Sequence, residues 1–188
     1  LGGVATAAAV VQFMGWKTAG GEHIIGGIAR EIAERLIARG ASPGFDWYTM
    51  STGTRMDRLE FDPEALKLVL DEMLTEAAVV PLLHSWVSRV EASEDRIVAV
   101  HALTKSGVLE FRPKVVIDAT GDMDVLAAAG CEMLPLEPGE ELQPASLMFR
   151  MGPIDFERFD AITPEEAKEI AKRGVEGGWR GGVADPWN

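Results

Sequence analysis

The chain has 188 residues, 18 of them basic and 30 acidic, which gives a formal net charge of −12. This length suits one domain, with or without an appended piece. An apolar fraction of 47% and five tryptophans exclude wholesale disorder or a fibrous repeat. The acidic excess, without a local basic patch, argues against DNA or RNA as a partner.

The single cysteine, Cys131, cannot form an internal disulfide, a CxxC pair or a multi-cysteine metal site by itself. We therefore expect a reducing, cytoplasmic setting. The most apolar early stretch, residues 4–11, is much shorter than the roughly 20 residues of a membrane-spanning helix and lacks the basic leader of a signal peptide. Because the chain opens with Leu1 and closes in a glycine-rich stretch, we expect it to be a fragment.

Two amphipathic helices are predicted in the first half of the chain. Residues 27–39 carry an apolar residue at every fourth position, and Gly40 follows as a C-terminal stop. Asp62 and Pro63 are typical of an N-cap and a first helical turn, and apolar residues then repeat at spacings of three and four as far as Ala77.

The middle of the chain changes to extended segments. Residues 79–83 are apolar and β-branched, which predicts a buried strand, and Pro81 places that strand at a sheet edge because it removes one ladder donor. In a doubly wound sheet ordered 3-2-1-4-5 the third strand lies at an edge, so this strand suits a βαβ unit whose earlier strands would precede Leu1. Polar turns at Glu94-Asp95 and Ser106-Gly107 divide residues 87–112 into an antiparallel meander.

The most informative segment is VVIDATGD, residues 115–122. A buried strand that ends in small residues and glycine brings backbone amides close to a ligand at the carboxyl edge of a sheet. The alternative is an ordinary turn in which Asp122 caps a short helix over residues 125–129, closed by Gly130. Both interpretations stay open from this segment alone.

A second glycine turn lies at LGGVAT, residues 1–6. Gly2 and Gly3 permit the chain to pass close to a cofactor, with Thr6 as a hydroxyl donor or acceptor. The alternative is a flexible loop before a helix. The other glycine pairs do not match G-x-G-x-x-G after a strand, so the chain carries no phosphate-binding fingerprint.

The remaining polar candidates carry weaker signals. The three histidines lack the spacing of metal ligands. We expect His84 and His101 in strands as packing or hydrogen-bonded residues, and His23 in an exposed glycine-rich loop where it could face a substrate. Cys131, after a helix stop, is expected to be a small buried apolar residue.

The last third offers one firm element. Thr163, Pro164 and Glu166 form the pattern of a capping box at the start of a helix. A strand is predicted over residues 146–151. Gln143 and Arg150 flank it, and either could recognise a carboxylate or a flavin edge, although surface solvation is the default for both. No repeat or low-complexity linker marks a domain boundary.

The predicted class is mixed α/β, and the order of segments resembles the FAD-dependent oxidoreductases of the glutathione-reductase-like superfamily. The resemblance covers nearly the whole chain and depends on the order of the motifs together. The segments that carry it are LGGVAT, residues 13–36 and 61–74, the meander, VVIDATGDMDVLAAAG at residues 115–130 and QPASLMFRMG at residues 143–152.

The resemblance implies a partial doubly wound, Rossmann-like FAD-binding domain over residues 1–15 and 60–135, with the β-meander at about 87–112. It implies a helical excursion near the cofactor over residues 16–59 and the start of a substrate or cap domain over residues 136–188. The G-x-G-x-x-G turn and the acidic strand end that hold the adenosine part would lie upstream of Leu1.

The resemblance also implies two groups of cofactor-binding residues. The group on the flavin side is Gly2, Gly3, Ala5 and Thr6. The group that meets the adenine or forms the second turn against FAD is Val87 through its backbone, Ala119, Thr120, Gly121 and Asp122, the last of which caps the following helix in the alternative interpretation.

The implied reaction is hydride transfer between an unknown small-molecule substrate and flavin N5, with no identified acid or base. In this family the upstream G-x-G-x-x-G turn holds most of the pyrophosphate. Without that turn, we expect these residues alone to bind FAD weakly or not at all. Iron-sulfur clusters occur in some relatives, but Cys131 alone cannot build one. A homo-oligomer is allowed, and membrane partners are not expected.

Two alternatives of other classes remain. One is a non-catalytic α/β scaffold or subunit-interaction module that has lost nucleotide binding. The other is a nicotinamide-only dehydrogenase, which would not require the long meander before the ATG turn.

Overall fold

A computed structural model describes residues 1–49, 53–134, 139 and 147–178. The chain divides into unit 1, which comprises Leu1–Ala78 and Ser146–Asn188, and unit 2, which comprises Val79–Ala145. The described parts are mixed α/β, as predicted, with one three-stranded antiparallel sheet in each unit. Among the described helices, none has the length and apolarity to cross a membrane.

The sheet of unit 1 consists of β1 (Gln12–Met14), β2 (Phe45–Thr49) and β3 (Arg55–Glu60), in the order β1-β3-β2. Leu59 pairs with Phe13 on one side and with Phe45 on the other, so these three residues share one face. A helical excursion is predicted over residues 16–59, but β2 and most of β3 lie within that range beside α1 (Gly27–Ala38). The sequence of β2, FDWYT, is interrupted by Asp46, and that of β3, RMDRLE, is mostly charged, so neither contains the apolar run of a buried strand.

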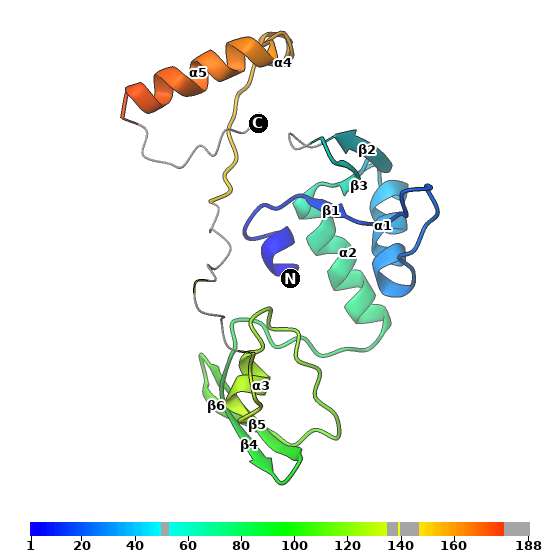
Figure 1. Cartoon of the computed structure of the whole chain (residues 1–188). Coiled ribbons are helices and arrows are strands. Elements are labelled where there is room, and N and C mark those ends of the chain that lie inside the picture. The colour runs from blue at the N-terminus through cyan, green and yellow to red at the C-terminus, as the bar shows by residue number, and fades with distance from the viewer. Residues whose placement is uncertain (50–52, 135–138, 140–146, 179–188) are drawn as a thin grey trace. The chain divides into compact units, whose positions relative to one another are not determined.

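Two helices of unit 1 form where the sequence predicts them. Helix α1 (Gly27–Ala38) ends before Gly40, whose φ of 67° suits glycine. Helix α2 (Pro63–Glu76) begins after Asp62, whose carboxylate accepts hydrogen bonds from the amides of Glu64 and Ala65 at 2.7 and 3.4 Å. The two helices lie side by side (Figure 1).

The core of unit 1 lies between these helices and the sheet. One cluster joins Leu36 of α1 to Leu66 and Val69 of α2, and Phe61 completes it. A second cluster consists of Trp16, Ala33 and Leu59. Burial of such side chains stabilises the fold by about 1.5 to 3 kcal/mol each.

The apolar stripe of α1 is only partly buried. Ile28 belongs to the predicted repeat but is 72% exposed, whereas Leu36 is fully buried. The core therefore covers the later turns of the helix and leaves its first turn open.

Unit 2 contains the predicted meander. Its strands are β4 (Trp86–Ser93), β5 (Arg96–Thr104) and β6 (Gly107–Phe111), paired antiparallel in that order. The first turn is at Glu94-Asp95 as predicted, but the second is at Lys105-Ser106, one residue earlier, because Gly107 with φ of 113° already opens β6. Helix α3 (Asp124–Ala128) packs against β4.

Two predicted buried strands are wrong. Neither residues 79–83 nor residues 115–117 form a strand, and Val80 and Ile117 are 89% and 86% exposed. A strand needs hydrogen bonds from a neighbour, and among the described residues neither segment has one. Both described sheets are antiparallel, so no doubly wound parallel sheet appears in the described parts.

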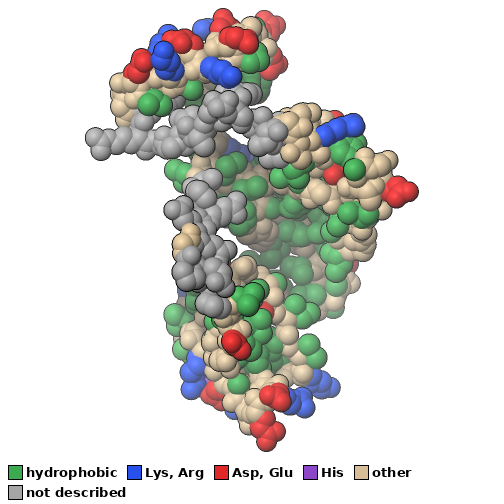
Figure 2. Space-filling view, viewed as in Figure 1, with side chains coloured by type: hydrophobic (Ala, Val, Ile, Leu, Met, Phe, Trp, Pro, Cys, Tyr) green, Lys and Arg blue, Asp and Glu red, His purple; other side chains and the backbone are tan. Residues whose placement is uncertain are grey.

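The helices of the last third are α4 (Phe156–Asp160) and α5 (Pro164–Glu176). The capping box of α5 is confirmed, because Thr163 and Glu166 exchange backbone-to-side-chain hydrogen bonds at 3.2 and 2.9 Å. Charged side chains crowd the surface of α5 in Figure 2. The predicted strand is absent over residues 147–151, and Ser146 lies outside the described residues.

Candidate functional site

The first predicted site segment folds as a tight N-terminal turn. A 3₁₀ turn, η1 (Gly3–Ala5), begins after Gly2, and the amide of Ala7 donates to the carbonyl of Gly3 at 2.8 Å. The hydroxyl of Thr6 donates to the carbonyl of Leu1 at 2.5 Å. Thr6 is only 7% exposed, so its side chain closes the turn from inside.

The two glycines of this turn differ in what surrounds them. Gly2 has φ of 90°, and a Cβ there would lie 2.4 Å from Cγ2 of Thr6. Gly3 has φ of 48°, and a Cβ there would meet no atom within 4 Å. Crowding within the turn therefore accounts for Gly2, whereas Gly3 is constrained only by its backbone angle.

The second predicted site segment is organised by Asp118. One carboxylate oxygen accepts from the amide and the hydroxyl of Thr120, at 3.0 and 2.7 Å, and the other accepts from the amide of Leu126 at 3.0 Å. The hydroxyl of Thr120 in turn accepts from the amide of Asp124 at 2.9 Å. These bonds join the turn to the first residues of α3.

The same contacts fix the charge of Asp118. The hydrogen bond from the Thr120 hydroxyl, followed by that from the Thr120 amide, lowers the pKa of the Asp118 carboxyl below its usual 3.8. Asp118 is therefore ionised at neutral pH and serves as an acceptor within the turn.

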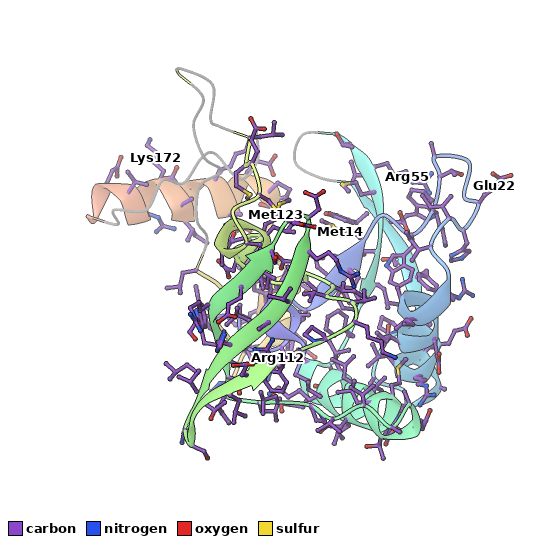
Figure 3. All side chains as sticks on the ribbon, turned by 90° about the horizontal axis from the view of Figure 1, so that it is seen from below. Met14, Glu22, Arg55, Arg112, Met123 and Lys172 are labelled. Atoms are coloured by element: carbon purple, nitrogen blue, oxygen red, sulfur yellow. The ribbon has the colours of Figure 1, made fainter. Side chains whose placement is uncertain are left out.

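The alternative interpretation, in which Asp122 caps the following helix, is wrong. The N-cap position of α3 is Met123, with φ of 59° and no side-chain cap (Figure 3). Asp118 and Thr120 satisfy helix amides instead. Asp118 is not among the predicted site residues, although an Asp side chain that accepts the amide two residues on is typical of an Asx turn. Gly130 ends the helix as predicted, with φ of 82°.

The other residues of the second group are placed as follows. Ala119, Gly121 and Asp122 are exposed, and a Cβ at Gly121, with φ of 95°, would meet no atom within 4 Å. Val87 lies in β4, which pairs only with β5 among the described strands. The register shifts between Val87 and Arg89, so the backbone is irregular there.

The histidines are placed in three different settings. His101 lies buried in β5, and its Nε2 is 3.0 Å from the Glu91 carboxylate, as expected of a hydrogen-bonded residue. His23 is exposed in its loop, as predicted. His84 is exposed outside any strand, with φ of 52°, because the strand predicted around it does not form.

Other weak candidates bring no further chemistry to these turns. Cys131 is exposed, so the prediction that it is buried is wrong. Arg150 is exposed, and Gln143 lies outside the described residues. In the described ranges, no three His, Cys, Asp or Glu side chains are grouped as a metal site requires.

The second turn fits a cofactor that approaches the backbone. The hydroxyl of Thr120 is occupied as donor and as acceptor within the turn, so it has no proton left for a ligand. The open space at Gly121 and the small side chain of Ala119 leave the main chain accessible. In the first turn, the buried hydroxyl of Thr6 is likewise directed inward. Contacts through backbone groups are the chemistry that these turns offer.

Comparisons with known proteins found a match at the family level. A family model described as FAD dependent oxidoreductase matches residues 1–182. No curated protein and no solved structure matches the chain.

Proposed function

Because this chain belongs to the FAD dependent oxidoreductase family, we propose that it helps to bind FAD for the oxidation or reduction of a small molecule. The family match over residues 1–182 is the observation that carries this proposal. When bound, FAD supplies the electron chemistry, as acceptor or donor of a hydride at N5.

The proposed role of the second turn is to present its main chain to FAD. Asp118 holds the turn in one shape through three hydrogen bonds from Thr120 and Leu126. Ala119 and Gly121 add no bulk that would block approach to the main chain. A turn that is already ordered binds a ligand without paying the entropy of ordering it.

The first turn is proposed to act through backbone groups as well. Gly2, Gly3 and Ala5 carry little or no side chain, and Thr6 is engaged within the turn. Val87 and Asp122 stay predictions from the family resemblance, and the cytoplasmic setting stays a prediction from the single cysteine.

Neither turn supplies an evident proton donor for the reaction. Asp118 is committed to three hydrogen bonds and its pKa is lowered, so it does not serve as a general acid at neutral pH. The two turns therefore bind and orient FAD in this proposal. The acid or base of the reaction is not among their residues.

Equilibrium dialysis of the purified chain against FAD tests the proposal. We expect weak but saturable binding, because the chain has no G-x-G-x-x-G turn for the pyrophosphate. Gly121→Ala should weaken binding by adding bulk where the cofactor approaches. Gly107→Ala is the matched control, since Gly107 lies in the same unit, also has positive φ and also has open space around it.

The outcomes are distinct. Weaker binding in Gly121→Ala alone supports the second turn as a flavin contact. Equal affinity in all three proteins would remove that turn from the site. Complete absence of binding in the unmodified chain would mean that the two turns cannot hold FAD without a G-x-G-x-x-G turn for the pyrophosphate.

A further inference from the structure

Cationic side chains and aromatic rings alternate on one face of the unit 1 sheet. The pairing of Trp47 with Asp57 and of Thr49 with Arg55 places β2 and β3 side chains on that face. The guanidinium carbon of Arg55 lies 4.5 Å from the ring centre of Trp47. The ammonium of Lys17 lies 6.0 Å from the same ring and 5.5 Å from the ring of Phe45.

The row ends at a third cation that is already neutralised. Arg30 of α1 lies 5.2 Å from the ring of Phe45, and its guanidinium forms an ion pair with Glu34 at 2.6 Å. Arg30 is therefore compensated by a neighbour one helical turn away.

Lys17 and Arg55 have no such compensation. Neither forms an ion pair with a carboxylate of the described residues, although the chain as a whole carries a net charge of −12. Asp57 lies on the same face, but it is only 3% exposed and its carboxylate accepts the amide of Trp16 at 2.9 Å. In Figure 3, Arg55 lies at the start of β3 and Glu22 at the outer edge of the loop after Lys17.

His23 lies near two of these cations, Arg30 and Lys17. Its ring meets the edge of Phe45 at 4.8 Å, and its Nδ1 lies 3.0 Å from the guanidinium of Arg30. Desolvation, then the charges of Arg30 and Lys17, lower the pKa of His23 below 6.5, while Asp57 opposes them. His23 is therefore neutral at neutral pH and adds no positive charge of its own.

We propose that Lys17 and Arg55, which both lie over Trp47, bind a small organic dianion with one carboxylate on each cation. Contact with the ring holds both cations near the surface before the ligand arrives, which reduces the ordering cost of binding. Arg55 also presents a planar fork of donors that matches a carboxylate. Two cations that form no ion pair with a carboxylate of the described residues, in an acidic chain, suit a small dianion and not a polyanion.

This inference goes beyond the proposed function, because the site needs no flavin. Its residues all belong to unit 1 and lie outside both glycine turns. The test is therefore made on the full chain without FAD, and its failure would leave the flavin proposal untouched.

The measurement is the indole N–H signal of Trp47 in ¹H–¹⁵N NMR spectra, assigned with Trp47→Phe. The probe is succinate, with succinamide as the neutral molecule of the same skeleton and potassium chloride at matched ionic strength. We expect a saturable shift with succinate alone, at a dissociation constant of about 1 mM, as suits an exposed ionic site.

Variants then test the named cations. Lys17→Met and Arg55→Met should each weaken succinate binding about fivefold, the upper range for an exposed ion pair. Lys67→Met is the matched control, because Lys67 lies in the same unit and already pairs with Glu64 at 2.8 Å. Its affinity should equal that of the unmodified chain.

Several results would overturn the proposal. These are an equal shift with succinamide, a shift that chloride reproduces, or an equal loss of affinity in Lys67→Met. If a variant loses its dispersed spectrum, the comparison of succinate with succinamide on the unmodified chain still decides.

Discussion

The two glycine turns of this chain are built in opposite ways. In the first, Gly2 is enclosed by its own turn, because Thr6 occupies the space where a side chain would lie. In the second, Gly121 faces open space, and the turn is held from behind by Asp118. A glycine that its own fold requires says little about a ligand, whereas a glycine beside open space leaves room for one.

Substitution of Gly2 should give the largest effect. In Gly2→Ala the new Cβ meets Thr6 and takes a positive φ, so we expect the turn to lose about 3 kcal/mol. Gly3→Ala, the matched control, meets no atom and should cost only about 1 kcal/mol. Hydrogen exchange of the Ala7 amide measures both, and equal costs would contradict the crowding argument.

Removal of the Asp118 charge should loosen the second turn. In Asp118→Asn an NH₂ group replaces one of the two acceptor oxygens, so the amide of Leu126 or of Thr120 loses its hydrogen-bond acceptor. Hydrogen exchange of that amide should therefore become faster than in the unmodified chain.

The pH dependence of the second turn follows from the same carboxylate. Because folding lowers the pKa of Asp118, its stabilisation is complete above the unperturbed value of 3.8 and is lost as the pH falls through the lower, folded value. NMR shifts of Thr120 should therefore stay constant from neutral pH to about 4 and change below it. The same change in Asp118→Asn would show that another group is responsible.

Loss of the Thr6 hydroxyl should have a moderate effect. Thr6→Val keeps the branched shape but removes the donor to the Leu1 carbonyl, at a cost of about 1 kcal/mol. Thr6→Ser keeps the donor and serves as the control. Exchange of the Thr6 amide, which donates to Gly3 at 3.1 Å, reports the difference, and no difference would mean that the hydroxyl does not close the turn.

Asp122→Ala should give the smallest effect on stability, within about 0.5 kcal/mol, because Asp122 does not cap α3. Urea denaturation of the variant checks this. A loss comparable with that of an N-cap, about 1 kcal/mol, would restore Asp122 to the capping role.

Local signals predicted the elements that carry their own partners. Helices α2 and α5 are marked by Asp62 with Pro63 and by Thr163 with Glu166, because capping needs only neighbours in sequence. The meander was predictable for the same reason, since each strand pairs with the next.

Elements that need distant partners could not be predicted in this way. The apolar runs at residues 79–83 and 115–117 are typical of strands, but a strand pattern does not supply the neighbour that hydrogen bonding requires. The pairing of β1 with β3 escaped prediction because the two strands meet across a long loop, with Gln12 opposite Glu60. The hairpin of β2 and β3 is local, and it escaped because neither strand contains the apolar run of a buried strand.

The candidate sites show the same division. The glycine turns were visible in the sequence, but the acceptor role of Asp118 depends on a bond that reaches Leu126. The placement of Lys17 and Arg55 near the ring of Trp47 could not be predicted, because the three residues come from separate segments of the chain.

The local pairing of the meander bears on the order in which the molecule acquires structure. Ser93 pairs with Arg96 and Thr104 with Gly107, so each hairpin closes a very short loop at little entropic cost, and hairpins of this kind form within about 1 to 10 μs. Sheet formation between β1 and β3 must wait for a far longer closure. A pulse of deuterium early in refolding should therefore find the β5 amides protected while those of β1, which pairs only with β3 among the described strands, still exchange.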